Sequence, residues 1–539
     1  NPIKHPDKNK ERRALVLQNM LDQGYISQND YDSAMEDDIY ARISEHNEET
    51  QSTNTVYSYF VDALIDQVQK DLVEKAGYSA TQASNALYSS GLKIYSTQKP
   101  EIQSALDEEF ANGENFPANT KVAIEWAMSV VDKDGNTTNY SQEMMFKYYK
   151  EQNSGYEPLY SSEEEAQAAI DGYVATLGIT DDDTVYEKSS FIMQPQASMV
   201  IEDQKTGEVV AMIGGRGEKT ASLTMNRATD STRQPGSTFK IVSTYAPALN
   251  ECGMTLATTY TDKPITYKDG TPVKNATNSY RGETTIREAI IHSINTVAVQ
   301  CFTDVTPQLG YEYLKKFGFT TVYDNISING KIYTDIQQPT ALGGITRGVS
   351  NLELTGAYAA IANSGTYIKP MFYTKILDED GNVVIDNTPE ERKVIKPSTA
   401  YLLTSAMEDV VSEGTGTRLQ LSNMHVAGKT GTTDTYNDVW FAGFTPYYTC
   451  TIWSGYDDNT KIPDTGNYRT YHQDLWNRIM SRIHENLEDK DFDKPATVGE
   501  ATVCKDTGML PTYNCPTVTE LFDTTELPNK RCTKHGGGG

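Results

Sequence analysis

The sequence predicts a mixed α/β (α+β) fold in which helices face an antiparallel sheet and an all-helical subdomain adjoins it. Residues 198–203 and 208–215 have the pattern of two strands, because apolar residues flank a Lys-Thr-Gly turn at 205–207. Helical patterns dominate from 235 to about 420, and three closely spaced strand patterns follow within 425–456. Strands at both ends with helices between them indicate one sheet faced by helices.

The first 50 residues carry two helical patterns. Leucine and methionine residues form an approximate stripe over 7–23, with Gly24 where a C-terminal cap belongs. Ser27 is a favourable N-cap and Asp30 follows three residues on, so a second helix should begin there.

Residues 51–190 predict a small N-terminal subdomain of α+β type. Patterns of both kinds alternate along it, beginning with an amphipathic helix over 57–73. The patterns that follow are a strand over 91–97, an apolar run over 122–131 that ends at a Lys-Asp-Gly turn, and a helix that begins at Ser162 and stops at Gly178.

The length of the chain limits its number of domains, and its net charge limits the kinds of partner it can bind. A chain of 539 residues is too long for one hydrophobic core and suggests roughly three to four modules. The net charge of −27 argues against nucleic acid or anionic lipid as a partner. No stretch approaches the ~18 uninterrupted apolar residues of a membrane span. The sequence opens at Asn1 in mid-pattern, so we expect a piece of a longer protein whose membrane anchor is missing.

The segment 233–240 predicts a nucleophile at the start of a helix. A Pro-Gly pair precedes Ser237, and apolar residues then recur at helical spacing. At a helix N-terminus, backbone N–H groups and the helix dipole favour the negative charge that develops during acyl transfer. Lys240 lies one turn on, on the same face, where its amine can reach the serine hydroxyl. Pro247 would interrupt this helix, and we expect a kink there.

A serine becomes a good nucleophile only when a neighbouring group takes its proton. A lysine with an ordinary pKa near ~10.4 is protonated at neutral pH, and lowering that pKa to ~7 needs roughly 4 to 5 kcal/mol of bias against the ammonium. Burial and a second cation supply such a bias. A second lysine should therefore converge on Ser237 and Lys240, and Lys429 is the candidate.

Two further motifs complete the set. Thr285 and Glu288 form a capping box for a helix that ends near residue 292, and Ser293-Ile294-Asn295 follows directly. Lys429-Thr430-Gly431-Thr432 lies in one of the late strands. Each motif alone is typical of an ordinary helix, turn or strand edge, and the three together in this order are far more specific.

Longer stretches around these motifs resemble class A penicillin-binding proteins. The stretches 226–240, 284–299, 340–370 and 427–458 are each similar to the corresponding part of that family. The resemblance extends over about 191–490, and residues 1–27 and 91–97 are similar to the end of the glycosyltransferase domain and to the linker strand that precede the transpeptidase there. It implies a penicillin-binding transpeptidase fold, which serine β-lactamases share.

The resemblance also implies a division of the chain. Residues 1–50 would be the C-terminal remnant of the glycosyltransferase domain, and 51–190 the linker region. Residues 191–490 would form the transpeptidase domain and 491–539 a C-terminal extension that carries family-like pieces. The acidic motif of the glycosyltransferase is absent, so no glycosyltransferase activity is expected.

Carried over position by position, the resemblance gives catalytic roles to five side chains. Ser237 would be the nucleophile and Lys240 its general base. Ser293 would relay a proton toward the leaving amine, Asn295 would hold the substrate amide and Lys429 would supply positive potential.

The same resemblance assigns the strand motif to substrate binding. Thr430 and Thr432 would bind the terminal carboxylate, and the backbone N–H groups of Ser237 and Thr432 would form the oxyanion hole. Gly431 would leave room for a peptide to lie along the strand as an added edge.

These roles imply a D,D-transpeptidase that cross-links peptidoglycan stem peptides through a serine acyl-enzyme and that β-lactams inhibit. Its partners would be stem peptides, β-lactam antibiotics and, through the missing N-terminal anchor, the membrane. It would act at the extracytoplasmic face of the cell membrane as a single-pass protein. No cofactor is expected.

A metal is not expected either. The seven histidines are scattered, with no pair at i, i+4 in a carboxylate cluster. Cys504, Cys515, Cys532 and His535 could be four ligands, but the cysteine steps of 11 and 17 residues lack paired short spacing, which favours a local disulfide or free thiols.

Other functions remain open. A β-lactamase needs a carboxylate to activate the deacylating water, usually in a Glu-x-x-Leu-Asn pattern, and none occurs between Asn295 and Lys429. A D,D-carboxypeptidase and a non-catalytic penicillin sensor or scaffold would keep the serine-lysine pair. The glycosyltransferase-like beginning argues against the sensor.

Overall fold

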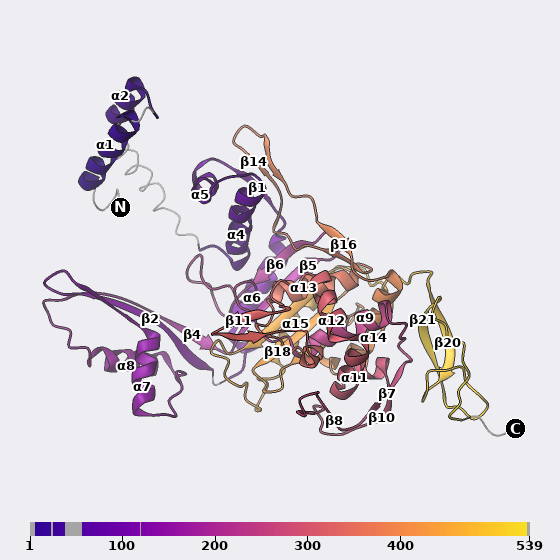
Figure 1. Cartoon of the computed structure of the whole chain (residues 1–539). Coiled ribbons are helices and arrows are strands. Elements are labelled where there is room, and N and C mark those ends of the chain that lie inside the picture. Colours follow the sequence, from indigo (N-terminus) through magenta and orange to yellow (C-terminus); the bar gives the residue numbers. More distant parts are fainter. Residues whose placement is uncertain (1–5, 23–24, 38–55, 119, 536–539) are drawn as a thin grey trace. The chain divides into compact units, whose positions relative to one another are not determined.

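A computed structural model describes residues 6–22, 25–37, 56–118 and 120–535 (Figure 1). The chain divides into two compact units, 1–57 and 58–539. The boundaries expected after residues 190 and 490 fall within the second unit and stay predictions. The boundary after residue 50, the cap at Gly24 and the final glycines lie outside the described residues.

The first unit contains the two expected helices, α1 (Pro6–Asp22) and α2 (Gln28–Glu36). Ser27 caps α2, and the Ser27 and Asp30 side chains each bond the other residue's backbone, which confirms the predicted capping box. The Arg13 guanidinium donates to the backbone carbonyls of Ala34 and Asp37 and so ties the two helices together.

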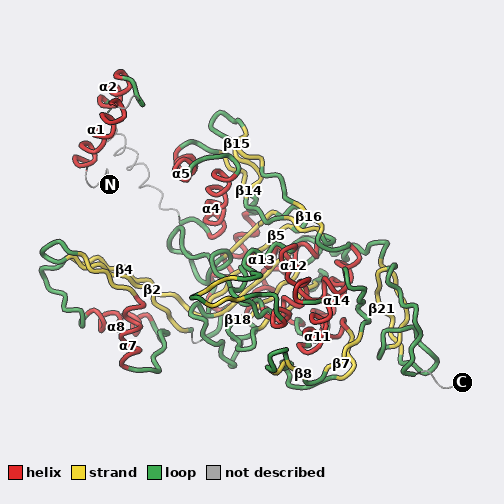
Figure 2. The backbone as a smooth tube through the Cα atoms, in the orientation of Figure 1, coloured by secondary structure: helices red, strands yellow, loops and turns green. Residues whose placement is uncertain are grey.

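The second unit is built on a five-stranded antiparallel sheet with strand order β17-β18-β19-β5-β6. Its strands are β5 (Gln196–Asp203), β6 (Glu208–Ile213), β17 (Ala427–Thr432), β18 (Asp438–Phe444) and β19 (Thr449–Gly455). In Figure 2 strands run through the middle of the unit with helices gathered beside them. The sequence assigned each of these strands correctly, and the mixed fold class is confirmed.

Alternation along the strands places the sheet between two apolar cores. Trp440 and Ala442 of β18 face one core, whereas Phe441 faces the other. Trp453 and Ile452 of β19 alternate in the same way. Helices α6 (Pro100–Ala111) and α15 (Tyr471–His484) cover the Phe441 face, and α13 (Asn351–Ala362) covers the other.

The helical subdomain lies beyond α13 and packs into the same core as Trp440. Its helices are α9 (Ala246–Asn250), α10 (Ile286–Ile291), α11 (Asn295–Val305), α12 (Pro307–Lys316) and α14 (Pro397–Ser412). Short ladders that the sequence did not predict occur between these helices. They pair β7 (Thr259–Asp262) with β10 (Gly282–Thr285), β8 (Ile265–Thr266) with β9 (Pro272–Val273), β11 (Ile326–Ile328) with β12 (Lys331–Tyr333), and β13 (Thr366–Ile368) with β16 (Glu391–Lys393).

The stretch 51–190, which the resemblance implies to be the linker region, contributes to two structural parts. Helices α4 (Tyr59–Glu74) and α5 (Ala80–Ser89) pack beside a sheet of β1 (Lys93–Ser96), β14 (Tyr373–Leu377) and β15 (Val383–Asp386). The expected α+β subdomain is a sheet of order β3-β2-β4 with two helices that share its core. Its elements are β2 (Lys121–Val131), β3 (Thr137–Ser141), α7 (Gln142–Gln152), α8 (Glu163–Val174) and β4 (Thr184–Gln194).

Within the described residues, no helix combines the length and the apolar character that crossing a bilayer requires.

One carboxyl group is buried in the central sheet without a partner. Glu202 of β5 is 1% exposed, and neither of its side-chain oxygens forms a hydrogen bond with any described residue. Burial, helped by the neighbouring Asp203 carboxylate, raises its pKa well above the ordinary value. Because the folded state holds this proton more tightly than the unfolded state, stability falls as the pH rises above the ordinary pKa of 4.5.

Replacing Glu202 with glutamine should therefore stabilise the fold at neutral pH. The gain should grow with pH by at most about 1.4 kcal/mol per unit above the ordinary pKa, and it should shrink toward pH 5. Urea unfolding at pH 5, 6 and 8 measures it, with the exposed Glu391→Gln as control. A gain that does not depend on pH would contradict this account.

Candidate active site

The three motifs come from distant parts of the chain and meet at the edge strand β17. Ser237 lies in η2 (Gly236–Thr238), a short helical turn that packs against β17. Lys240 begins the next helical segment, η3 (Lys240–Tyr245). Ser293 and Asn295 lie at the junction of α10 and α11. The fold therefore gathers the predicted site residues around one end of β17.

Two glycines allow η2 to approach β17 closely. Gly236 has φ of +55°, and a Cβ there would lie 2.6 Å from the Thr432 carbonyl oxygen. A Cβ on Gly431 would lie 2.6 Å from the Pro235 carbonyl oxygen. Any side chain at either position would push Ser237 away from the strand. The space beside Gly431 is thus occupied by the chain itself, and its role toward a peptide stays a prediction.

The helix that carries Lys240 is wider than an α-helix. Over η3 it has π-helical geometry, and the Ala246 N–H donates to the Ile241 carbonyl five residues back. Pro247 then lies in the first turn of α9, where a missing N–H costs nothing. The expected kink at Pro247 is thus a change from π to α geometry.

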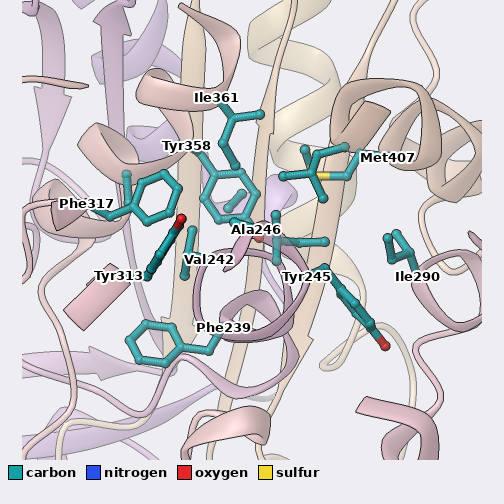
Figure 3. Packing of buried hydrophobic residues seen from close by; sticks show 14 of the residues in the cluster. Phe239, Val242, Tyr245, Ala246, Ile290, Tyr313, Phe317, Tyr358, Ile361 and Met407 are labelled. Carbon is teal, nitrogen blue, oxygen red and sulfur yellow. The ribbon is translucent and has the colours of Figure 1, made fainter. Parts of the chain in front are cut away.

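Aromatic packing fixes this wide helix in place. Figure 3 shows Phe239, Val242 and Tyr245 from this segment among Tyr313 and Tyr358 of neighbouring helices. The Tyr358 hydroxyl donates to the Thr238 carbonyl at 2.8 Å, directly after Ser237. Because all five of these side chains are buried, the backbone around Ser237 has little freedom to move.

A hydrogen-bonded cluster joins the two lysines through Ser293. The Lys240 amine lies 3.1 Å from Ser293 Oγ, and it also contacts the Ser293 carbonyl at 2.7 Å and Asn295 Oδ1 at 2.6 Å. The Lys429 amine lies 2.9 Å from the same Ser293 Oγ and 3.1 Å from the Thr430 carbonyl. The Ser293 hydroxyl therefore bridges both amines, as a proton relay requires.

Both lysines are fully buried, which disfavours their charged forms. Burial lowers the pKa of Lys429 to about 7. Burial, together with repulsion from the Lys429 ammonium, holds the pKa of Lys240 well below its ordinary range. These effects favour a neutral amine at Lys240, beside a Lys429 amine that is partly protonated near pH 7. This is the pair that the chemistry of an activated serine requires.

The backbone of the second motif is held in an unusual conformation. Ser293 has φ of +55°, which turns the chain sharply between α10 and α11. The capping box of Thr285 and Glu288 starts α10 as predicted. Asn275 then accepts from the Asn295 N–H at 3.0 Å, and its own amide donates to buried Asp262 at 2.8 Å.

Comparison with known proteins decides the family. The penicillin binding protein transpeptidase domain family matches residues 197–480, and the C-terminal domain family of penicillin-binding protein 1A matches 494–537. Penicillin-binding protein 1A of Clostridium tetani is 32% identical over 98% of this chain and 60% of its own length. Penicillin-binding protein 1A of Aquifex aeolicus is 30% identical over 99% of this chain and 70% of its own. The chain belongs to the class A penicillin-binding proteins.

Solved structures of penicillin-binding proteins share the fold. Penicillin-binding protein 1A of Haemophilus influenzae has a TM-score of 0.61 at 20% identity, covering 99% of this chain and 84% of that one. PonA1 of Mycobacterium tuberculosis in complex with penicillin V has a TM-score of 0.57 at 20% identity, covering 81% and 96%. The chain spans 53% to 63% of the length of the clostridial relatives.

Two contacts in this penicillin-binding protein were not predicted from the sequence. Thr415 lies 2.6 Å from Thr430, hydroxyl to hydroxyl, beside the edge of β17. Asn275 supports Asn295 from a loop 20 residues away. Neither residue belongs to a periodic pattern or a local cap. Only the tertiary fold brings them to the site.

One predicted contact is not formed. Among the described residues no group hydrogen-bonds the Ser237 hydroxyl, although Lys240 follows one turn on. Ser237 is half-buried at the start of its helix. In the absence of substrate, catalytic hydrogen bonds are often long and tighten only in the complex.

Proposed function

We propose that this chain is a serine D,D-transpeptidase that cross-links peptidoglycan stem peptides. The observation that carries the proposal is the buried cluster in which Lys240, one turn after Ser237, and Lys429 share the Ser293 hydroxyl. Membership in the class A penicillin-binding proteins supports it. The proposal extends to a serine acyl-enzyme and to covalent inhibition by β-lactams.

In the acylation step Ser237 Oγ attacks the carbonyl carbon of the penultimate D-alanine of a stem peptide. The neutral Lys240 amine takes the hydroxyl proton, and the backbone N–H groups of Ser237 and Thr432 stabilise the oxyanion. The C–N bond then breaks, and the leaving D-alanine amine receives a proton through the Ser293 hydroxyl. The product is an ester between Ser237 and the shortened peptide.

In the transfer step an amine from a second stem peptide attacks this ester. Its proton returns along the same relay, the C–O bond to Ser237 breaks, and a new amide joins the two peptides. The Ser237 hydroxyl and the neutral Lys240 are restored, so the cycle is balanced. Asn295 would hold the donor amide in position throughout.

The edge of β17 suits the binding of an extended peptide. Because β17 is the outermost strand of the sheet, a substrate can add along it as a further strand. Thr430 and Thr432 are half-buried on this strand and would hydrogen-bond the terminal carboxylate. The Lys429 ammonium adds positive potential beneath them. A penicillin presents a carboxylate and a strained amide in a similar way, so it would acylate Ser237.

Peptidoglycan lies outside the cytoplasmic membrane, so we propose that the site acts at its extracytoplasmic face. In the full-length protein a single membrane-spanning segment would anchor it there. Membership in the class A penicillin-binding proteins supports this localisation.

The acceptor amine distinguishes the proposal from its alternatives. The chain would be incubated with a donor peptide ending in D-Ala-D-Ala, with and without an acceptor amine, and the products separated by mass. A transpeptidase gives donor-acceptor amide that increases with the acceptor concentration. Hydrolysed donor as the main product, in an amount that does not change with the acceptor concentration, would indicate a carboxypeptidase. No D-alanine release under any condition would indicate a sensor or scaffold.

Lys429→Ala should slow acylation by penicillin tenfold or more, because a charge-assisted contact to the carboxylate is worth ~1.5 to 3 kcal/mol. Loss of the neighbouring ammonium should also raise the pKa of Lys240, so the acid limb of the pH–rate profile should move to higher pH. Stopped-flow rates from pH 5 to 9 measure both effects. Lys188→Ala, on an exposed strand, is the control. An unmoved acid limb would show that the two lysines are not coupled.

Thr432→Val should slow acylation by a similar factor of about tenfold, because the hydroxyl that bonds the carboxylate is lost while the shape is kept. Its acid limb should stay where it is in the unaltered protein, which separates it from Lys429→Ala. Thr502→Val, at an exposed position, is the matched control. Unchanged rates in both Thr432→Val and Lys429→Ala would mean that β17 does not bind the carboxylate.

A further inference from the structure

The C-terminal segment forms a hairpin with little hydrophobic core. It consists of β20 (Val498–Cys504) and β21 (Thr517–Asp523), and its strands are joined and followed by long loops (Figure 1). The core beneath it contains Val503, Phe522 and Ala257 as buried members. A two-stranded hairpin with so few buried apolar side chains is marginally stable by itself. An additional cross-link is therefore expected.

Four metal-ligating side chains converge at one end of this hairpin. Cys504 ends β20, Cys515 precedes β21, and Cys532 and His535 lie in the last described turn. One ligand atom from each of the four lies within 4.8 Å of every other. Cys504 Sγ lies 3.4 Å and Cys532 Sγ 3.5 Å from His535 Nδ1. All three cysteines are free thiols.

These distances match the edges of a tetrahedral zinc site. With Zn–S near ~2.3 Å and Zn–N near ~2.0 to 2.1 Å, tetrahedral geometry separates sulfur from nitrogen by about 3.6 Å and two sulfurs by about 3.8 Å. The two sulfur–nitrogen distances above are within about 0.2 Å of that value. Two of the six edges of such a site are thus already close to the required length, and none of the other four exceeds 4.8 Å.

We propose that Cys504, Cys515, Cys532 and His535 bind one structural zinc ion. Three thiolates and one imidazole form one of the ligand sets typical of closed zinc sites, and no open position remains for catalysis. The soft sulfur ligands disfavour magnesium and calcium, which prefer oxygen. None of the four ligands belongs to the proposed catalytic set around Ser237. The zinc proposal therefore does not depend on the proposed function.

Surrounding groups orient the ligands. Asp506 lies 3.2 Å from His535 Nε2, which leaves Nδ1 directed at the sulfurs. The Thr512 N–H donates to Cys515 Sγ at 3.2 Å. The Cys532 N–H donates to the Leu510 carbonyl at 2.8 Å, which fastens the last turn to the loop between the strands. Such outer contacts accompany most metal-bound histidines and thiolates.

Sequence spacing concealed this site. The steps between the cysteines are long, and Cys532 with His535 is the single short pair among the four. The hairpin ladder supplies the missing proximity, because Cys504 pairs with Thr517 across β20 and β21 and so lies beside Cys515. The sequence predicted no metal and favoured a disulfide or free thiols for these residues, and the proposed zinc ion departs from that expectation.

The hairpin contacts the transpeptidase domain next to a catalytic motif. Glu520 of β21 forms an ion pair of 2.7 Å with Arg287 of α10, the helix that leads to Ser293. Gly508 packs so closely on Ala257 that a Cβ would lie 2.2 Å from its carbonyl oxygen. A zinc ion that holds the loops at 504–535 would therefore also hold this contact surface in shape.

Metal analysis of the purified full chain tests the proposal. After dialysis in reducing, zinc-buffered solution, inductively coupled plasma mass spectrometry should find about one zinc per chain. Cys515→Ser and His535→Ala should each reduce this to a small fraction, whereas Cys252→Ser, a free cysteine outside the cluster, should keep it. Cobalt exchanged into the site should show the visible absorption of a tetrahedral thiolate complex, and zinc removal should lower the unfolding temperature of the unaltered chain.

Two results would overturn the proposal. The first is a chain that stays metal-free after this treatment, whether its cysteines are free thiols or, in a sample purified without reductant, joined in a disulfide. The second is zinc content that is equal in Cys515→Ser, His535→Ala and Cys252→Ser, which would place the ion elsewhere. Circular dichroism confirms that each variant is folded before its metal is counted.

Discussion

Replacing Ser237 with alanine should abolish peptide transfer and the release of D-alanine from a D-Ala-D-Ala donor. Without the hydroxyl no acyl-enzyme can form, and the remaining lysines have no nucleophile to activate. The change should leave the fold intact, because Ser237 is half-buried and its hydroxyl bonds no described residue. Released D-alanine, measured with an oxidase assay, should fall to the background rate.

Ser231→Ala is the matched control for this change. It removes a hydroxyl from the same segment, six residues upstream and outside η2. It should retain donor cleavage within about twofold of the unaltered protein, as surface substitutions usually do. Equal losses in Ser231→Ala and Ser237→Ala would indicate a folding defect in this segment rather than the loss of a nucleophile.

Replacing Lys240 with methionine should slow acylation by about 10²- to 10⁴-fold, the usual contribution of a positioned general base. Methionine fills a similar volume and is uncharged, so the buried position should accept it. The rate that remains should lose the acid limb that titration of Lys240 gives the unaltered protein, because rates there rise as the amine loses its proton. Penicillin acylation followed by stopped-flow from pH 5 to 9 measures rate and profile together.

Lys315→Met, in the exposed last turn of α12, controls for the general effect of losing a lysine. It should acylate at the ordinary rate with the ordinary pH profile. A Lys240→Met variant that keeps the acid limb would contradict the assignment of Lys240 as the base and would point to another titrating group.

Local signals in the sequence predicted the elements that local interactions determine. The capping boxes at Ser27 with Asp30 and at Thr285 with Glu288 start helices as expected, because each satisfies backbone donors within one turn. The strand around Lys429 was predicted as the first of three closely spaced strand patterns within 425–456. The chemistry of an activated serine allowed one long-range prediction. A general-base lysine needs a lowered pKa, and this requirement predicted that Lys429 would lie close to Lys240.

Features that depend on distant packing were not predictable in detail. The sequence indicated a break at Pro247, but the π geometry of η3 depends on neighbours such as Gly310, where a Cβ would lie 2.9 Å from the Ser243 carbonyl oxygen. Thr415 and Asn275 reach the site through loops and follow no period. The short ladders between the helices and the cysteine cluster likewise arise only when the chain is folded.

The most direct test of the central claim is the mass of the unaltered chain during exposure to penicillin, followed by tryptic mapping. Cleavage after Arg233 and Lys240 isolates the peptide 234–240, in which Ser237 is the single serine. We predict one penicillin adduct per chain, located on this peptide, that persists far longer than it takes to form, since the natural second substrate is an amine rather than water. An adduct on the peptide 228–233, or rapid loss of the adduct with many penicillins hydrolysed per chain, would contradict the assignment.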